Sequence, residues 1–301
     1  MNIAITGGTG LVGSTLTGYL TQQGHHVYIL TRNSKNQQNK ANITFVQWLD
    51  KGLYPEKELP NIDAVVNLAG ASINKRWTAK HKQAILHSRI RATKEVTRII
   101  QEMESPPDVL INASAVGYYG VSNQTTFTEA TPPQNRDFLQ DVCERWEKEA
   151  SKVEKMGVRT VYARFGLILD KKEGALPKIM LPYKLFAGGP IGSGKQWYSW
   201  IHLRDVIEMI VFAICHEEVK GALNVTAPNP ERMKDFGKKL GNAMNRPHWA
   251  PVPAFLLRNA LGDMSLLVLK GQRVLPEKMM SHGYGFSYPA LDEALTDLVQ
   301  P

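Results

Sequence analysis

Three glycines near the start of the chain have the spacing of a phosphate-binding turn. Gly7, Gly10 and Gly13 follow a short apolar run at residues 3–6 and open a segment with helical spacing at residues 11–22. In such a turn the first glycine permits a tight bend, the second lets the backbone approach a pyrophosphate, and the third lets the helix pack close to the strand. Unpaired backbone N–H groups and the helix dipole then hold the phosphates. The pattern predicts a dinucleotide-binding site, with a purely structural turn as the alternative.

The residues that follow the second apolar run indicate which dinucleotide this site would hold. The run at residues 26–30 leads into Thr31 and Arg32. A fold that prefers NAD places a carboxylate about 20 residues beyond the glycines, where it binds the ribose 2′-OH. No carboxylate is present there, and Arg32 can instead pair with a 2′-phosphate, while Thr31 can add a hydroxyl donor. We therefore expect NADP(H) as the cofactor, with a solvated Arg32 as the alternative.

Strand and helix signals alternate through the first half of the chain and define the frame for this site. Apolar, β-branched runs at residues 64–68, 109–113 and 159–165 alternate with helical segments, one capped by Thr78 and one near residues 136–156. Strands separated by helices indicate βαβ units and a parallel sheet. We expect an α/β fold with a Rossmann-type doubly wound parallel sheet and a smaller C-terminal α+β lobe.

The second half of the chain is richer in glycine and proline and shows only short elements. We assign residues 1–170 to an NADP-binding Rossmann domain, completed by a strand near residues 222–226. Residues 171–301 are expected to form a smaller lobe that covers the substrate, with helices near residues 206–216 and 289–299.

Composition and charge narrow the function classes. The 301 residues carry a net charge of +8, but the Lys and Arg residues are scattered, so we expect no nucleic-acid partner. No apolar run reaches the roughly 18 residues that span a bilayer, and the first residues lack the pattern of a signal peptide, so no membrane partner is expected. Cys143 and Cys215 lack metal-ligand and CxxC spacing. We expect a cytoplasmic monomer or homodimer without a metal site.

Several motifs together carry a family resemblance. The TGxxGxxG run at residues 6–13 and the Asn67-Leu68-Ala69-Gly70 run are similar to the short-chain dehydrogenase/reductase superfamily, in its extended, nucleotide-sugar-epimerase-like branch. Within that branch the chain resembles, nearly end to end, the atypical group called epimerase family proteins (the YfcH-like proteins). Further matching motifs are Trp77, Ser88-Arg89, residues 114–120, Trp146-Glu147, residues 188–194, Trp200-Ile201-His202 and residues 269–276. The C-terminal segment, about residues 250–298, is similar to a small domain found almost only in this group.

The resemblance implies a cofactor cleft with defined residues. The glycine loop and the strand end at residues 68–70 would bind the cofactor, the latter beside the nicotinamide ribose, and the backbone near Ile168 would border the nicotinamide. Arg89 would reach the cofactor phosphates, where a cation offsets their charge; an arginine on a helix surface is the alternative. The expected cofactor-binding residues are Thr6, Gly7, Thr9, Gly10, Leu11, Val12, Gly13, Thr31, Arg32, Leu68, Ala69, Gly70, Arg89 and Ile168.

The residue pair that usually transfers a proton in this superfamily is absent. Its members use Tyr-x-x-x-Lys, in which the tyrosine is the general acid/base and the lysine lowers the tyrosine pKa and binds the nicotinamide ribose. Counting from Glu147, Leu139 occupies the tyrosine position and Cys143 the lysine position. Cys143 as a nucleophile lacks an evident base partner, and burial in the helix packing is its alternative role.

Three hydroxyl residues near the carboxyl edge of the expected sheet are the candidate catalytic groups. They are Ser114, Tyr118 and Tyr119, and Ala115 competes with Ser114 for the position of the upstream hydroxyl. The two tyrosines could donate a hydrogen bond or a proton; the alternative is that they form an aromatic floor for the pocket.

Other motifs indicate structure rather than chemistry. Residues 189–195 fit the GxxxxGK half of a P-loop, but Gln196 replaces the Ser or Thr that holds magnesium, so we expect a flexible loop that closes over the substrate. His202 and Asp205 are expected to form hydrogen-bonded structure that joins the lobes. Glu129 is expected in a loop near the cleft, as a minor candidate for substrate contact.

These features favour an NADP(H)-binding oxidoreductase or nucleotide-sugar-epimerase-like enzyme that acts on an unidentified small molecule. Because the Tyr-x-x-x-Lys pair is missing, the sequence leaves open whether the chain is an enzyme. The alternative is a non-catalytic, NADP(H)-binding regulatory or scaffold protein.

Overall fold

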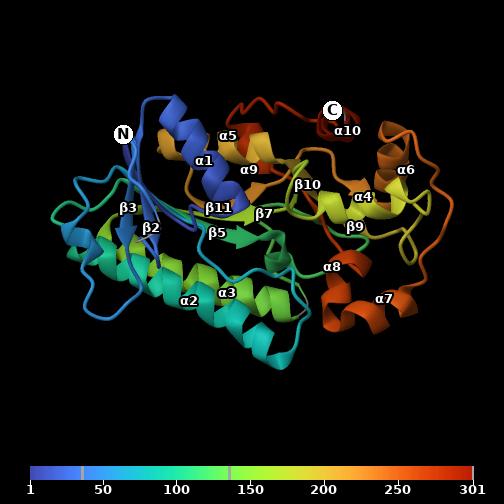
Figure 1. Ribbon diagram of the computed structural model, residues 1–301, viewed down its shortest axis with the longest axis horizontal. Helices are drawn as coiled ribbons and strands as arrows, with labels where there is room; N and C mark the ends of the chain where they lie inside the picture. The colour runs from blue at the N-terminus through green and yellow to red at the C-terminus, as the bar shows by residue number, and fades with distance from the viewer. Residues whose placement is uncertain (35–36, 135–136, 300–301) are drawn as a thin grey trace.

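The centre of the molecule is a parallel sheet whose strands are short apolar runs. The computed structural model describes residues 1–34, 37–134 and 137–299. Seven parallel strands form the sheet in the order β3-β2-β1-β4-β5-β7-β11 (Figure 1). They are β1 (Asn2–Thr6), β2 (His26–Thr31), β3 (Ile43–Gln47), β4 (Ala64–Asn67), β5 (Val109–Ala115), β7 (Arg159–Phe165) and β11 (Gly221–Val225). This architecture confirms the predicted Rossmann-type doubly wound sheet.

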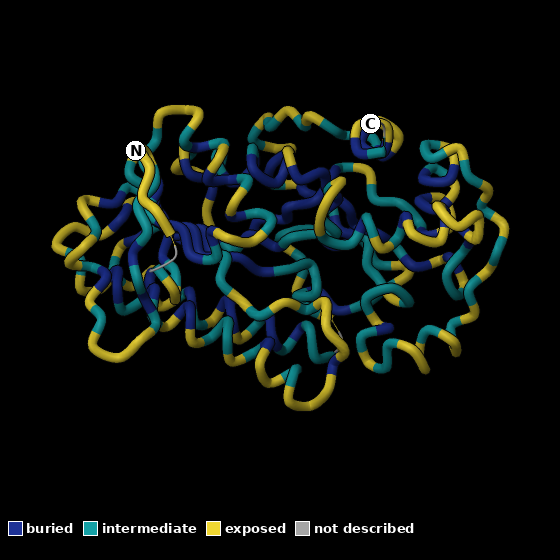
Figure 2. The backbone as a smooth tube through the Cα atoms, viewed as in Figure 1, coloured by how far each residue is buried: buried dark blue, intermediate teal, exposed yellow. Residues whose placement is uncertain are grey.

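Helices cover both faces of the sheet because successive side chains of each strand point to opposite sides. On β1, Ile3 and Ile5 belong to the apolar cluster shared with α1 (Leu11–Gln22) and α5 (Leu203–Cys215). Ala4 belongs to the opposite cluster, which includes residues of α2 (Ala79–Glu102). Figure 1 shows α1 and α5 on one side of the sheet and α2 with α3 (Phe138–Ala150) on the other, and Figure 2 shows the buried backbone between them.

The strand order reverses between β1 and β4, and this reversal places the binding crevice. The chain runs outward from β1 through β2 to β3, then returns to β4 on the other side of β1. In an open α/β sheet, ligands bind outside the carboxyl ends of the strands at such a switch point. The glycine turn that follows β1 therefore lies where the fold itself provides a crevice.

The helix ends follow local capping rules. Thr78 caps α2 as predicted, because its Oγ1 accepts a hydrogen bond from the His81 backbone N–H at 3.2 Å. Asp137 caps α3 in the same way, through the Gln140 N–H at 2.9 Å. The helix predicted over residues 136–156 ends earlier, at Ala150, and continues as a 3-10 helix, η3 (Ser151–Met156); Arg136 lies outside the described residues.

Elements from the second half of the chain divide between the central sheet and a smaller C-terminal region. The helix predicted near residues 206–216 is α5, which packs on the central sheet, and the strand predicted near residues 222–226 is β11, which pairs with β7. The helix predicted near residues 289–299 is α10 (Leu291–Val299). Strand β3, at the edge of the sheet, is an element that the sequence analysis missed.

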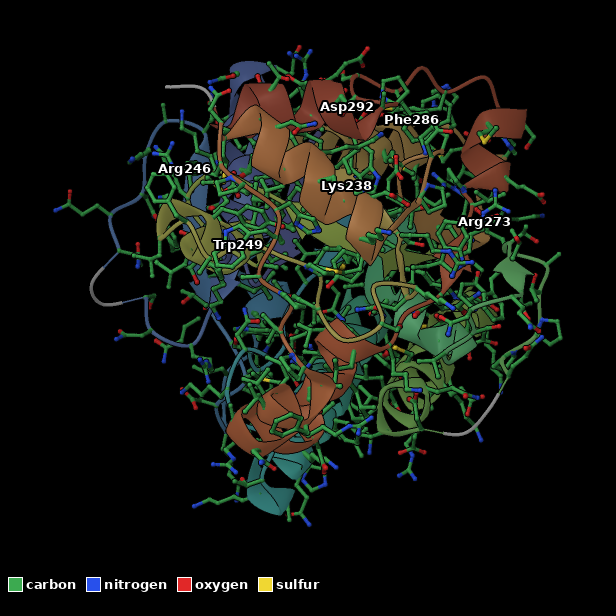
Figure 3. The ribbon with its side chains drawn as sticks, turned by 90° about the vertical axis from the view of Figure 1, so that its right-hand side faces the viewer. Lys238, Arg246, Trp249, Arg273, Phe286 and Asp292 are labelled. Carbon is green, nitrogen blue, oxygen red and sulfur yellow. The ribbon has the colours of Figure 1, made fainter. Side chains whose placement is uncertain are left out.

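The smaller region has its own apolar core. Trp200, Phe236 and Leu295 are buried together in a cluster formed by α4 (Leu176–Lys184), α6 (Met233–Ala243), α10 and the strands near them. Figure 3 faces this region, with Lys238 on α6 and the exposed Trp249 on the loop beyond it. The remaining short elements are β6 (Thr126–Phe127), β8 (Leu167–Leu169), β9 (Trp197–Tyr198), β10 (Trp200–His202), β12 (Glu231–Arg232), α7 (Ala254–Leu261), α8 (Leu266–Leu269), β13 (Arg273–Val274), α9 (Glu277–Ser281) and the 3-10 helices η1 (Pro55–Lys57), η2 (Val116–Tyr119) and η4 (Gly262–Ser265).

The C-terminal segment is joined to the first half of the chain by backbone pairing. Strand β13 pairs in parallel with β6, and the Ser122 N–H donates to the Gly271 carbonyl at 3.1 Å. Ser199 Oγ donates to the Gln272 carbonyl and accepts from the Val274 N–H. These contacts hold residues 271–274 against Ser199 and against the segment at residues 122–127 that follows β5 and η2.

Candidate cofactor site and adjoining cavity

The turn after β1 has space only for glycine at two of its positions. Gly7 has φ +68°, and a Cβ on it would lie 2.8 Å from the backbone carbonyl of Leu68. A Cβ on Gly13 would lie 2.3 Å from the Gly7 carbonyl oxygen. Helix α1 begins immediately after Gly10, which provides no side-chain cap. The first N–H groups of α1 are therefore directed at the crevice without a competing side-chain acceptor, which is the arrangement that binds phosphate.

A buried hydrogen-bond network fixes the ends of β1 and β4 beside this turn. Thr6 Oγ1 donates to Asn67 Oδ1 at 2.7 Å and accepts from the N–H groups of Leu68 and Ala69, both at 3.1 Å. Asn67 Nδ2 in turn donates to Asn112 Oδ1 at 2.7 Å. Thr6, which was predicted to bind the cofactor, is fully buried and positions the 68–69 backbone.

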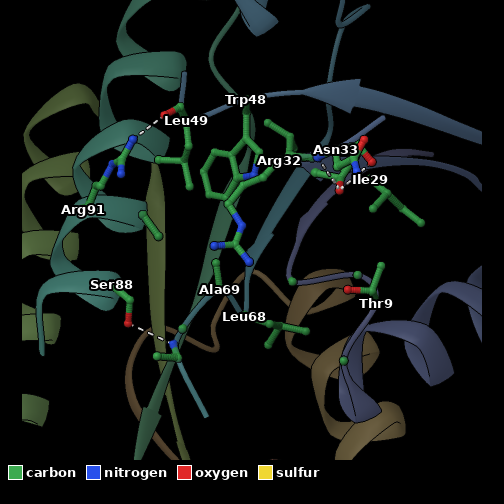
Figure 4. A pocket seen from close by; sticks show the side chains of 18 residues that line it. Thr9, Ile29, Arg32, Asn33, Trp48, Leu49, Leu68, Ala69, Ser88 and Arg91 are labelled. Carbon is green, nitrogen blue, oxygen red and sulfur yellow. Dashed lines mark hydrogen bonds between the residues drawn. The ribbon is translucent and has the colours of Figure 1, made fainter. Parts of the chain in front are cut away.

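A cavity of about 520 Å³ opens between the glycine turn, the ends of β2 and β4, and α2 (Figure 4). The predicted residues that line it are Gly7, Thr9, Gly10, Thr31, Arg32, Leu68, Ala69 and Gly70. The cavity is also lined by residues that were not predicted from the sequence, which are Gly8, Ile29, Leu30, Asn33, Trp48, Leu49, Ala71, Ser88, Arg91 and Ala92. The cavity thus combines the phosphate-binding turn with an arginine at the end of β2.

Arg32 is free to bind an anion in this cavity. Figure 4 shows its side chain reaching into the space beside Trp48. Among the described residues no carboxylate forms an ion pair with Arg32, and none lines the cavity. Arg91 on α2 also lines the cavity and donates a hydrogen bond to the Leu49 carbonyl (Figure 4). Both cations favour a ligand with phosphate near the end of β2.

Arg89 lies under the cavity wall rather than in it. Its Nη1 donates to the carbonyls of Ala71 and Ile85 at 3.1 and 3.0 Å, and its guanidinium stacks over the Trp146 ring at 4.9 Å. Burial lowers the pKa of this guanidinium. Residues two apart on a helix point in different directions, whereas residues three apart share a face. Ser88 and Arg91 therefore face the cavity, and Arg89 supports the loop at residues 70–71. Contact between Arg89 and the cofactor phosphates stays a prediction.

The other predicted cofactor residues lie near the start of α1 but do not line this cavity. Leu11 and Val12 pack against the main core, as does Ile168 on β8. A Cβ on Gly174 would lie 3.5 Å from Leu11 Cδ2 and 3.8 Å from the Ile168 carbonyl oxygen. The structure thus brings Leu11 and Ile168 to the same end of the crevice, and their contact with a nicotinamide stays a prediction.

A second cavity, of about 240 Å³, lies where the missing catalytic pair would be. Leu139 and Cys143, one turn apart on α3, both line it. Its opposite wall comes from the C-terminal segment, including Leu266, Lys270 and Gln272. Burial raises the pKa of the Cys143 thiol to about 12, so this side chain does not supply a thiolate at neutral pH.

The three predicted catalytic hydroxyl residues do not line this second cavity. Ser114 Oγ donates to Glu147 Oε1 at 2.6 Å, and Tyr119 OH donates to Asn224 Oδ1 at 2.7 Å while accepting from Arg164 Nη1 at 2.9 Å. Arg164 bonds Glu147 through two nitrogens, at 2.9 and 2.8 Å.

These contacts leave the hydroxyls of Ser114 and Tyr119 occupied. Burial raises the pKa of Tyr119 to about 12, and its ring has no exposed surface. Tyr118 stacks on the Arg164 guanidinium, whose central carbon lies 3.4 Å from the ring centroid. Both tyrosines pack with Phe127 behind the cavity, and proton transfer by Tyr118 stays a prediction.

The remaining motifs have structural contacts. His202 caps α5 and pairs with Asp297 at 3.2 Å, while Asp205 accepts from the N–H groups of Ser287 and Tyr288, as expected for residues that join the two regions. Glu129 accepts from the Asn224 N–H on β11 and does not line either cavity. In the part of the chain that the structure describes, no cluster of His, Cys, Asp or Glu could hold a metal ion, and no helix is long and apolar enough to cross a membrane.

Comparison with known proteins agrees with this fold. Residues 3–139 match the NAD dependent epimerase/dehydratase family, and residues 252–298 match a domain of unknown function, DUF1731. The epimerase family protein YfhF of Bacillus subtilis is 56% identical over 99% of this chain and 98% of its own length. The epimerase family protein SERP0438 of Staphylococcus epidermidis is 46% identical over 98% of both chains.

Two solved structures share the whole fold. The crystal structure of human epimerase family protein SDR39U1 (isoform 2) with NADPH superposes with a TM-score of 0.87 at 30% identity, covering 99% of both chains. A nucleoside-diphosphate sugar epimerase from Corynebacterium glutamicum superposes with a TM-score of 0.78 at 30% identity, over 99% of this chain and 58% of that one.

The parallel sheet, its glycine turn and the cavity beside it define an NAD(P)-binding Rossmann protein. The chain belongs to the NAD-dependent epimerase/dehydratase family, among the epimerase family proteins that carry a C-terminal DUF1731 domain.

Proposed function

We propose that the chain binds NADP(H) in preference to NAD(H) and uses it in an oxidation–reduction or epimerase-like reaction on a small molecule. The observation that carries the cofactor preference is Arg32, which enters the cavity at the end of β2, where no carboxylate of the described residues lines the space. A carboxylate there would bind the ribose 2′-OH of NAD and repel a 2′-phosphate. The NADPH in the crystal structure of the human relative supports the same choice.

The residues present fit this cofactor. The backbone of the Gly7–Gly10 turn would hold the pyrophosphate, Arg32 and Thr31 the 2′-phosphate, and Leu68 to Gly70 the far side of the crevice. When bound, the cofactor supplies or accepts two electrons as hydride. Thr6 and Asn67 would keep the crevice in shape without touching the ligand, since their polar atoms are satisfied by one another and by the backbone.

Titration calorimetry with NADPH and NADH tests the cofactor assignment. We expect NADPH to bind at least about tenfold more tightly, roughly 1.4 kcal/mol, and Arg32→Ala to abolish that preference. Arg258→Ala, an exposed arginine on α7 outside both cavities, is the matched control and should keep it. Equal affinities for the two cofactors in the unaltered chain would reject the assignment.

A second candidate function is a non-catalytic protein whose conformation follows NADP(H) occupancy. Leu139 and Cys143 at the positions of the proton-transferring pair favour it. Single-turnover oxidation of bound NADPH against sugars, aldehydes, ketones and quinones separates the two functions. If none of these compounds oxidises the bound NADPH, although the cofactor still binds tightly, the result supports the regulatory function.

We also propose that the protein acts in the cytoplasm as a monomer or homodimer. Both cysteines are free thiols in the structure, Cys143 buried and Cys215 exposed, which suits a reducing compartment. Fractionation of cells and light scattering of the purified chain test the two parts of this proposal.

A further inference from the structure

The cavity that contains Leu139 and Cys143 has walls of a distinct chemistry. They are made mainly of aliphatic and aromatic side chains, among them Val116, Phe165 and Leu267. Its volume of about 240 Å³ is below the roughly 300–1,000 Å³ of sites for drug-sized ligands. The space suits one or two fused rings.

The polar side chains around this cavity are already committed to the protein. Ser199 bonds the backbone of residues 272 and 274, Gln272 Nε2 donates to the Val116 carbonyl at 2.8 Å, and Trp197 Nε1 donates to the Asn123 carbonyl at 3.2 Å. A sugar buried here would lose its hydrogen bonds to water without regaining them, which is costly for each hydroxyl. The cavity therefore disfavours a polyol and favours a planar apolar ring. Lys270, an exposed side chain, is the positively charged residue that lines the cavity.

The groups in and near the cavity that could donate a proton restrict the reaction further. Reduction of an aldehyde or ketone by hydride leaves an alkoxide, which is about as basic as hydroxide. Such a product needs a proton donor in the site. Leu139 occupies the position of that donor, and the hydroxyls of Ser114 and Tyr119 are hydrogen-bonded behind the wall. Of the protic groups that line the cavity, Tyr198 OH donates to the Val268 carbonyl and Asp137 accepts from the Gln140 N–H. The buried Cys143 thiol and the exposed Lys270 ammonium also line it.

A quinone does not need that donor. On accepting a hydride it forms one O–H bond, its ring becomes aromatic, and the electron pair remains on the other oxygen as a phenolate. The conjugate acid of a phenolate has a pKa of about 10, so water can supply the second proton. The net change is quinone plus NADPH plus one proton to hydroquinone plus oxidised cofactor, in which two electrons and one hydrogen leave the cofactor.

We propose that the cavity between α3 and the C-terminal segment binds a small quinone or similarly planar, apolar acceptor, and that it does not bind a nucleotide sugar. This inference rests on the proposed NADP(H)-dependent function for its reaction, but the binding site itself consists of residues of this chain. Lys270 lies where a cation can stabilise the developing phenolate.

Equilibrium binding to the whole chain saturated with NADP⁺, which cannot reduce a ligand, tests the site directly. The probes are 2-methyl-1,4-naphthoquinone and UDP-glucose, followed by quenching of tryptophan fluorescence and by calorimetry. We expect saturable binding of the naphthoquinone and none of UDP-glucose. Leu139→Asn should weaken naphthoquinone binding at least tenfold and leave NADPH affinity within twofold. Leu256→Asn, the same change at an exposed leucine outside the cavity, should alter neither.

Leu266→Asn provides a second cavity variant, because this partly exposed residue lines the space without being part of a buried core. It should also weaken naphthoquinone binding, and circular dichroism checks that each variant is folded. UDP-glucose binding that competes with the naphthoquinone, or naphthoquinone binding unaffected by both cavity variants, would overturn the inference.

Turnover provides the second measurement. NADPH oxidation under anaerobic conditions should be at least a hundredfold faster, in kcat/KM, with 2-methyl-1,4-naphthoquinone than with 2-naphthaldehyde, a ring system of the same size that yields an alkoxide. Lys270→Gln should lower kcat for the quinone, whereas Lys184→Gln, at an exposed lysine of α4, should not. Equal rates for the two substrates would contradict the proton argument. A failure of NADPH to bind would reject the cofactor assignment alone, since the quinone titration can then be run on the chain without cofactor.

Discussion

Removal of one partner from the buried ion pair between Glu147 and Arg164 is expected to destabilise this fold strongly. The Glu147 carboxylate accepts hydrogen bonds from Arg164 Nε and Nη2, at 2.9 and 2.8 Å, and from Ser114 Oγ at 2.6 Å. The side chains of Arg164 and Glu147 are only 5% and 10% exposed. Glu147→Gln removes the negative charge, keeps the shape, and leaves the guanidinium buried without its counter-ion.

The structure sets the size of the expected effect. Breaking one partner of a buried pair costs about 3–5 kcal/mol, which is a large fraction of the roughly 5–15 kcal/mol that stabilises a typical domain. The control lies on the same helix: Asp141 pairs with Arg145, whose side chains are 45% and 59% exposed. Because exposed pairs contribute about 0–1 kcal/mol, Asp141→Asn should cost less than about 1 kcal/mol.

Urea unfolding followed by far-ultraviolet circular dichroism measures both variants. We expect the unfolding midpoint of Glu147→Gln to fall well below that of Asp141→Asn. Replacing both partners with apolar residues, Glu147→Leu with Arg164→Met, should recover much of the loss, because no unpaired charge is then buried. If Glu147→Gln and Asp141→Asn unfold at the same urea concentration, the pair is not a stabilising element and the reasoning is refuted.

Three further outcomes are expected. Gly13→Ala should lower NADPH affinity at least about tenfold by calorimetry, because its Cβ would lie 2.3 Å from a backbone oxygen of the turn; an unchanged affinity would exclude the turn from binding. Burial lowers the pKa of His202 and His248 below 6.5, so the unfolded chain binds more protons in acid, and the free energy of unfolding in urea should fall as the pH drops from about 7.5 to 5.5; the variant His202→Asn with His248→Asn should flatten that dependence. A thiol reagent at neutral pH should label Cys215 quickly and Cys143 only after unfolding, since Cys143 is buried and its pKa is raised to about 12.

Elements with strong local signals could be predicted from the sequence. Helix α1 and strand β7 have the predicted bounds, and Thr78 caps α2 through its hydroxyl as expected. Each of these depends on residues close in the chain, such as a glycine turn before a helix or a hydroxyl before an apolar repeat. Strand β3 was missed although its Ile-Thr-Phe-Val residues favour a strand; it is short and lies at the edge of the sheet.

The candidate site also combines residues that local spacing predicts with residues that only the folded chain brings together. The glycine turn and Arg32 follow directly from local spacing, and the structure brings them to one cavity. Arg91 and Trp48 were missed because their position depends on how α2 and the end of β3 approach β2, which no local pattern encodes. Leu139 could be identified from the sequence as a departure from the Tyr-x-x-x-Lys motif. That it lines an apolar cavity could not be predicted, because the opposite wall comes from residues 266–272.

The two cavities differ in how much of the chain must exist before each is complete. Every residue that lines the cofactor cavity lies between Gly7 and Ala92, whereas the apolar cavity closes only with Leu266 to Gln272. During synthesis on a ribosome, the segments for the first cavity therefore emerge well before those for the second. A nascent chain would meet its dinucleotide while the neighbouring cavity is still open on one side, so ligand-assisted folding of the amino-terminal half could precede the formation of any place for a second ligand.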